Sequence, residues 1–250
     1  MATDWTAAAG SKCALLCEDA SSPLQDATSN NSDATVVGSP NYQQTGKYST
    51  FGFGFDKTNG EYLNLNSPTA LDNVSPISVT MWANNTDRGT AGTVTDGAIL
   101  YNCGDYRSGV FGFQNTNQLR WYEHFAGGSI SYDTTNGSVV NSAFQHYAVV
   151  FDNSGTSPTD IPDIYIDKVS QTVSASGSPF LTRDDDSASD KYIGQDSLGG
   201  GELNSVLDEI LVYAGLLTST DVAEIYDNGL DGTHGTATST SYRLLLLGVG

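Results

Sequence analysis

The stretch Ser205–Gly229, SVLDEILVYAGLLTSTDVAEIYDNG, is made of two contrasting halves. Its first half, VLDEILVY, is rich in β-branched and aromatic residues around two acids, a composition typical of a β-strand. Its second half begins with Thr218, has an acid three residues later, and sets Val222 and Ile225 at helical spacing before a glycine. An N-cap residue, an acid in the first turn and a terminal glycine together predict a short helix near residues 218–228.

The composition of the whole chain is typical of an all-β domain with many turns. Its 250 residues include 27 Gly and 13 Tyr, and 10 Lys and Arg stand against 29 Asp and Glu. The resulting net charge of −19 disfavours nucleic acid and anionic membranes as partners, because contact with phosphate requires Lys and Arg. The sequence also lacks an apolar run of the ~18 residues that a membrane-spanning helix needs, so we expect no membrane insertion.

The three cysteines are predicted to be free. On an extended chain, Cys13 and Cys17 would lie ~13 Å apart, which is too far for a disulfide between them. We therefore expect buried thiols, and a bridge from Cys103 to one of the other two is the alternative. Residues 1–12 form a polar leader without the basic and apolar regions of a secretory signal.

Between the leader and the quoted stretch, short segments of alternating apolar and polar residues are separated by Gly, Asn and Pro. Such a pattern predicts a series of half-buried strands. The expected strands cover residues 14–17, 34–37, 50–56, 61–66, 76–83, 98–106, 109–115, 118–125, 129–134, 143–152, 162–168 and 191–194.

Five of these segments resemble, in the right order, the strands of LamG-like jelly rolls in the concanavalin A-like lectin and glucanase superfamily. Two positions depart from the family pattern, since Phe144 stands where tryptophan is usual and Lys168 replaces a turn glycine. The resemblance implies an all-β, two-sheet antiparallel jelly-roll sandwich with one short helix. The domain would cover residues 13–229, and residues 230–250 would form a flexible spacer and an apolar C-terminal strand.

The resemblance also implies a structural Ca²⁺. In the family, an acid in the loop after the first strand often helps to hold this ion, together with the acid of the last strand. Asp26 and Asp208 occupy these positions here. Oxygen ligands from loops suit Ca²⁺, although most acids of such an acidic chain are expected to be solvated loop residues. Trp82 occupies the tryptophan position of the family, which is more often core than ligand platform.

The strands between residues 98 and 134 form the part of the sandwich where a ligand face is expected. Their aromatic residues suit sugar rings, but sandwich cores also need aromatic residues. With strict alternation, Trp121 and Glu123 share one face of their strand while Tyr122 and His124 share the other, and one of these faces belongs to the core. The glycan-binding candidates are Tyr101, Trp121, Tyr122 and His124.

The pattern of acids and histidines disfavours an enzyme. A retaining glucanase needs two carboxylates about 5 Å apart, usually from an E-x-D-x-x-E run on one strand, and the sequence has no such run. Asp208 and Glu209 are neighbours in a predicted strand, so alternation places them on opposite faces. The three histidines are far apart in sequence and lack the spacing of metal ligands.

The chain ends in an apolar segment that contains Leu244, Leu245, Leu246 and Leu247. Four consecutive leucines are not an alternating surface strand. They indicate either a strand paired with the N-terminal strand of the same domain or an assembly contact docked on another subunit.

Two functions compete at this stage, both non-enzymatic. The first is a virion-exposed structural or adhesive protein, a phage head decoration or tail-associated adhesin. It is suggested by the missing export signal, the unpaired cysteines and the apolar tail, and by a resemblance to uncharacterised phage structural proteins. Its partners would be other virion subunits, further copies of itself or a cell-surface glycan, and its location the virion surface. The alternative is an extracellular carbohydrate-binding module of a larger secreted, glycan-active protein.

Overall fold

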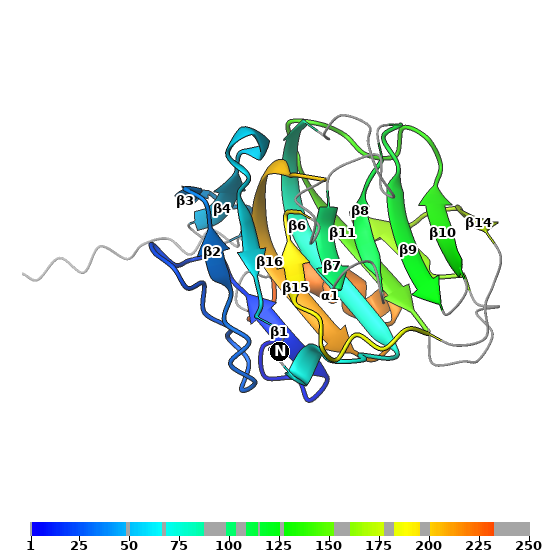
Figure 1. Ribbon diagram of the computed structural model, residues 1–250, viewed down its shortest axis with the longest axis horizontal. Coiled ribbons are helices and arrows are strands. Elements are labelled where there is room, and N and C mark those ends of the chain that lie inside the picture. Colours follow the sequence, from blue (N-terminus) through cyan, green and yellow to red (C-terminus); the bar gives the residue numbers. More distant parts are fainter. Residues whose placement is uncertain are drawn as a thin grey trace, which may run out of the picture.

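Two antiparallel β-sheets pack face to face and form a sandwich (Figure 1). The computed structural model describes residues 2–48, 51–66, 69–87, 99–103, 109–114, 116–125, 128–152, 161–177, 183–195 and 201–232. The predicted all-β jelly-roll sandwich with one short helix is confirmed. Leu244–Leu247, and with them the predicted assembly contact, lie outside the described residues.

The first sheet, called here the helix-side sheet, has the strand order β13-β12-β11-β6-β16-β4-β3, with β1 paired to β16. Its centre is the long antiparallel pair of β6 and β16, so residues 206–213 belong to an inner strand, as predicted. The strands are β1 (Ser11–Leu15), β3 (Asn41–Thr45), β4 (Phe51–Phe55), β6 (Ile77–Asp87), β11 (Phe144–Phe151), β12 (Asp163–Ile166), β13 (Val169–Ser170) and β16 (Asn204–Ala214).

The second sheet, called here the meander sheet, has the order β14-β10-β9-β8-β7-β15-β5-β2. Strands β7 to β10 follow one another as the predicted meander. The strands are β2 (Thr35–Val37), β5 (Tyr62–Asn64), β7 (Ile99–Cys103), β8 (Val110–Phe113), β9 (Leu119–Phe125), β10 (Gly128–Thr134), β14 (Val173–Gly177) and β15 (Lys191–Ile193), and the 3₁₀ turns are η1 (Lys57–Asn59) and η2 (Thr69–Leu71).

The core lies between the two sheets and is rich in aromatic residues. It is filled by alternate residues of each strand, as the sequence pattern predicts; in β9 every second residue is buried. Burial of each large apolar side chain stabilises the fold by roughly 1.5–3 kcal/mol. The three cysteines are free and buried, as predicted. The members of the core include Phe53, Met81, Phe111, Trp121, Tyr147 and Ile210.

Helix α1 (Ser219–Asn228) covers the outer face of the helix-side sheet. It starts at a capping box in which Thr218 and Asp221 bond each other's backbone, and it ends at Gly229 in a positive-φ conformation (φ 73°). Its buried residues Val222 and Ile225 belong to an apolar cluster with residues of β1, β11, β12 and β16. The described residues contain no helix that is long and apolar enough to cross a membrane.

Part of the polar leader also packs on this face. Trp5 has 6% of its surface exposed, and its ring meets Tyr213 edge-on with 6.0 Å between centroids. Its backbone N–H donates to the carbonyl oxygen of Leu230 at 2.7 Å. Helix α1 and the leader therefore cover one outer face of the sandwich together.

A β-bulge overturns the prediction that Asp208 and Glu209 point to opposite faces. The register of β16 shifts between Asp208 and Leu211, and Glu209 has a φ of 49°. Leu207 and Ile210, on either side of the two acids, both belong to the inter-sheet core. The extra residue thus turns both acids to the helix side, where the Glu209 carboxylate accepts the N–H of Leu230 at 3.2 Å.

Because the bulge buries Glu209 beside Asp208, we expect the stability of the protein to change with pH through the Glu209 carboxyl group. Burial, and next the charge of Asp208, raise the pKa of Glu209 from 4.5 to about 8. A raised folded-state pKa means that the stability contributed by this group is fully present below about pH 4.5 and is lost as the pH rises through about 8. Glu209→Gln removes this dependence. The free energy of unfolding of the variant, measured by urea denaturation, should therefore increase relative to that of the wild type as the pH rises from about 4.5 to about 8. Parallel pH profiles for the two proteins would contradict this explanation.

Candidate functional site

Asp26, a predicted metal ligand, is used by its own loop. One carboxylate oxygen accepts the N–H groups of Ala14 and Thr28, each at 2.9 Å. The other accepts the hydroxyl of Thr28 at 2.7 Å and the N–H of Ser32 at 2.8 Å. Because all four donors belong to the loop or to β1, the carboxylate holds this loop against the sheet.

Asp208, the second predicted metal ligand, lies buried in a different hydrogen-bond network. Its carboxylate accepts the N–H groups of Lys47 at 2.7 Å and Tyr48 at 3.2 Å. Within the described ranges, no three His, Cys, Asp or Glu side chains form a group that could hold a metal ion. Calcium binding through Asp26 and Asp208 therefore stays a prediction.

Two of the four predicted glycan-binding residues belong to the core. Tyr101 and Trp121 are both 0% exposed, and the Trp121 indole N–H donates to the Glu123 carboxylate at 2.9 Å. Their rings offer no surface to a sugar, so this part of the prediction is wrong. The alternation of β9 sends Trp121 inward, and Tyr122 and His124 consequently lie on its outer face, partly exposed.

A row of side chains crosses the outer face of the meander sheet at right angles to the strands. The register of neighbouring strands puts its members opposite one another, one from each strand. The row consists of Asn64 on β5, Tyr192 on β15, Asn102 on β7, Val110 on β8 and Tyr122 on β9.

Asn102, in the middle of this row, is the most unusual residue of the face. It is 0% exposed, and neither its Nδ2 nor its Oδ1 has a hydrogen-bond partner. An unsatisfied buried amide costs about 1–3 kcal/mol, and most buried polar atoms in native proteins have a partner. Asn102 lies in the row between two half-buried tyrosines, Tyr122 and Tyr192, and these two rings are the part of the row that an outside group can reach.

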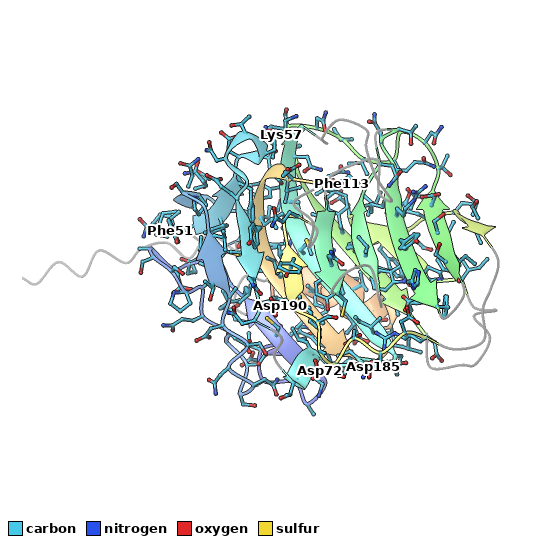
Figure 2. The ribbon with its side chains drawn as sticks, in the orientation of Figure 1. Phe51, Lys57, Asp72, Phe113, Asp185 and Asp190 are labelled. Atoms are coloured by element: carbon cyan, nitrogen blue, oxygen red, sulfur yellow. The ribbon has the colours of Figure 1, made fainter. Side chains whose placement is uncertain are left out.

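Tyr192 is held in place from the side. Its ring meets that of Tyr62 edge-on, with 5.8 Å between centroids. Its hydroxyl donates to the Asp190 carboxylate at 3.4 Å, and the same carboxylate accepts the Asn64 amide at 3.3 Å. Figure 2 labels Asp190 close to β15. These contacts pre-orient the Tyr192 ring beside Asn64 in the row.

The charged groups beside Tyr122 are paired with each other. Arg120 makes a two-pronged ion pair with Asp133, with N–O distances of 2.6 and 2.9 Å. His124 Nδ1 lies 2.7 Å from a carboxylate oxygen of Asp184. The outer face of β9 thus presents a tyrosine between two side-chain pairs, Arg120 with Asp133 and His124 with Asp184.

An ion-pair network beneath this face fixes the segment that carries Asp184. Arg183 binds Glu123 at 3.1 Å and Asp186 at 2.9 Å, and the side chains of these two acids are fully buried. Lys191, also fully buried, binds Asp72 at 2.9 Å. Asp72 lies with Asp185 at the lower edge in Figure 2. The network ties residues 183–191 to β9 and η2, and so it positions the partner of His124.

Tyr192 and Asn102 were not singled out from the sequence. A signal for each is present, since Tyr192 alternates with inward Lys191 and Ile193, and Asn102 is the one amide in an otherwise apolar strand, ILYNC. Neither signal says which face is open or that the amide lacks a partner, because both depend on strands that are distant in sequence.

Comparison with known proteins identifies the fold. Residues 56–223 match the family model described as the concanavalin A-like lectin/glucanases superfamily. Domain 4 of AbnA, a GH43 extracellular arabinanase from Geobacillus stearothermophilus solved in complex with arabinotriose, is similar with a TM-score of 0.55 and 16% identity. The similarity covers 87% of this chain and 98% of that domain.

Toxin binding domains share the same architecture. The binding domain of Paraclostridial Mosquitocidal Protein 1 has a TM-score of 0.63 and 12% identity, over 87% of this chain and 52% of that one. The binding domain of botulinum neurotoxin DC, solved in complex with rat synaptotagmin II, has a TM-score of 0.61 and 12% identity, over 87% and 51%. This chain thus spans about half the length of these domains, and at such identities the likeness concerns the fold alone. The search of curated proteins found no match.

The hydrogen bonds of Asp26 predict a large, metal-independent effect of its removal. Asp26→Ala leaves buried donors unpaired and should lower the free energy of unfolding by about 2–4 kcal/mol, with or without a chelator. Asp19→Ala is a matched control that should cost less, because the Asp19 carboxylate accepts one N–H, that of Gln25 at 2.9 Å. Should chelation of the wild type reproduce the loss and leave the Asp26→Ala variant unaffected, a bound cation would explain the effect instead.

Proposed function

We propose that this chain, which belongs to the concanavalin A-like lectin/glucanase superfamily, is a non-catalytic carbohydrate-binding module. Its ligand would lie across the outer face of the meander sheet, over the row from Asn64 to Tyr122. The two partly exposed tyrosines of this row, Tyr122 and Tyr192, are the observation that carries this proposal. The similar arabinanase domain, of almost the same length and solved with a bound oligosaccharide, lends support.

The residues of the row suit the two-sided chemistry of a sugar. A sugar ring has apolar C–H faces, which pack on aromatic rings, and Tyr122 and Tyr192 provide such rings on either side of Asn102. Its hydroxyl groups both donate and accept hydrogen bonds, as a tyrosine hydroxyl also does. A few polar groups between apolar surfaces are the usual composition of a specific small-ligand site.

The acids of this region are engaged in ways that suit binding better than hydrolysis. A glycosidase needs a pair of carboxyl groups that can reach the scissile bond as acid and nucleophile or base. Asp133 and Asp184 are each held by a basic side chain, and Glu123 lies inside the core against Trp121 and Arg183. None of these acids is presented to a ligand as a free catalytic group.

The virion-surface role predicted from the sequence has less support than the secreted-module alternative. One of its three supporting features, the apolar tail at residues 244–247, lies outside the described residues. The arabinanase whose fourth domain is similar to this chain is an extracellular enzyme. We therefore favour an extracellular, glycan-directed role, while a virion partner or a homo-oligomer stays a prediction.

Two variants separate the ligand face from the buried amide beside it. Asn102→Leu removes the orphaned amide, so this variant should gain about 1–3 kcal/mol in free energy of unfolding. Tyr122→Ala removes a partly exposed ring of the row, so it should lose at least ~10-fold in affinity for a glycan that the wild type binds, as measured by calorimetry. Unchanged affinity in Tyr122→Ala would overturn the proposed ligand face.

Two controls complete this experiment. Asn64→Leu changes a partnered asparagine of the same row, and because it breaks the hydrogen bond to Asp190 it should not stabilise the protein. Val169→Ala alters a residue with 61% of its surface exposed on the helix-side sheet, and it should leave binding unchanged. A loss of affinity in Val169→Ala would place the ligand on another face.

A further inference from the structure

The geometry points to a groove beside the start of helix α1 as a docking site for a segment of this same chain, Arg243–Leu247, which lies outside the described residues. The groove has a volume of about 600 Å³. Its described lining combines four apolar residues with two acids and a threonine. The lining residues are Val150, Asp152, Ile161, Asp163, Leu216, Leu217 and Thr218.

The groove lies on the outer face of the helix-side sheet, away from the proposed glycan face. Ser78 of β6 is opposite Val150 of β11, and Val150 is opposite Asp163 of β12. Val150 belongs to the apolar cluster that packs against α1, so these side chains face the helix side. The inference is therefore independent of the proposed carbohydrate-binding function.

Two hydrogen bonds hold Leu216 at this groove. The Ser78 hydroxyl donates to the carbonyl oxygen of Gly215 at 2.7 Å and accepts the N–H of Leu217 at 3.1 Å. The neighbours of Leu216 on both sides are thus fixed, while its own side chain is 49% exposed. Ile161, 55% exposed, lines the same groove. Two of the four large apolar side chains that are exposed in the described part of the chain therefore meet at one place, where a partner can cover them.

The charge of the groove indicates what kind of partner fits. Asp163 is exposed and Asp152 is partly exposed, and the described lining contains no basic side chain. An apolar segment that carries a positive charge and no acid is therefore complementary to it. Residues 232–250 contain no Asp or Glu, and Arg243 precedes four consecutive leucines. The segment Arg243–Leu247 thus matches the groove in both charge and hydrophobicity.

The chain is long enough for this segment to reach the groove of its own molecule. Thr218 lines the groove and is the N-cap of α1, whose 10 residues span ~15 Å. Residues 229–232 add at most ~14 Å, so Gly232 lies within roughly 30 Å of the groove. Residues 233–243, when extended, span up to ~36–40 Å.

This attachment favours the groove of the same molecule over that of a second copy. Residues 233–241 are rich in Gly, Ser and Thr, a composition typical of a flexible linker. A linker of this length has a root-mean-square span of roughly 18 Å and gives an effective concentration in the millimolar range. Two copies would in addition repel each other, because each has a net charge of −19.

Trypsin, which cleaves after Arg243, tests whether the segment is docked. The rate of this cleavage in the full chain is compared, by mass spectrometry, with the rate in a synthetic peptide of residues 238–250. Proteolysis follows the population of the undocked form, so we expect cleavage of the wild type to be at least ~10-fold slower than that of the peptide.

Substitutions in the groove test where the segment docks. Leu216→Asn and Ile161→Asn change exposed side chains, so both should keep the melting temperature of the wild type. Each should raise the rate of cleavage after Arg243 at least ~3-fold. Val140→Asn is the matched control, because Val140 is 53% exposed and is not among the lining residues, and its cleavage rate should equal that of the wild type.

A charge variant tests the role of the acidic rim. Asp163→Asn removes a negative charge from the groove, so cleavage after Arg243 should be faster than in the wild type at low salt. The difference should shrink at high salt, where the attraction between Arg243 and Asp163 is screened. An identical rate for both proteins at low salt would contradict pairing between Arg243 and the rim.

Disulfide trapping provides a measurement that does not depend on proteolysis. Leu216→Cys combined with Leu245→Cys should form a bridge within one chain under mild oxidation, because the native cysteines Cys13, Cys17 and Cys103 are buried. The control combines Val140→Cys with Leu245→Cys and should not form it.

The remaining outcomes would each overturn a part of the inference. Equal cleavage of the wild type and the peptide would show that the segment is not docked. Protection that neither groove substitution reduces would place the segment elsewhere on the protein. Protection that increases with protein concentration, or a bridge between two chains, would identify a second copy as the occupant.

Discussion

Val222 and Ile225 of helix α1 pack with Ala148 and Leu211 in one apolar cluster, and this contact closes one of the two outer faces of the sandwich. Trp5 of the leader belongs to the same cluster and extends the cover. A sandwich buries the inner faces of both sheets in any case, so a ligand can approach only an outer face or the loops. With the helix side occupied, the outer face of the meander sheet is the one on which two partly exposed aromatic side chains, those of Tyr122 and Tyr192, belong to one row across the strands.

The covered face also carries polar groups, but these groups contact other side chains of the protein. His146 is fully buried without a hydrogen bond to its ring, and burial lowers its pKa to about 3, so it stays neutral at physiological pH. Its ring lies 5.2 Å from that of Trp82, which in turn is 5.0 Å from Tyr226 of helix α1. Lys47 caps this aromatic group, with its Nζ 4.7 Å from the Trp82 ring. These contacts explain why Trp82, at the tryptophan position of the family, is a core residue and not a ligand platform, as the sequence led us to expect.

The fold was predictable because its signals are local. Alternation located the strands, and Thr218, Asp221 and Gly229 marked both ends of the helix within about one residue.

The site was only partly predictable. Strict alternation separated Trp121 from Tyr122 but could not say which faces the core, and it failed at Glu209, where a bulge adds one residue to β16. Asp26 was recognised as an important acid, yet its four hydrogen bonds within the protein could not be read from the sequence. Asn102 was missed because an unpartnered amide is defined by strands far from it in the chain.

Hydrogen–deuterium exchange of the protein with and without a bound neutral oligosaccharide tests most directly where the ligand lies. The account predicts slower exchange in β7, β9 and β15, whose outer faces carry Asn102, Tyr122 and Tyr192, and no change in α1 or β1. Slower exchange confined to α1, β1 or the loop around Asp26, with β7, β9 and β15 unaffected, would contradict it.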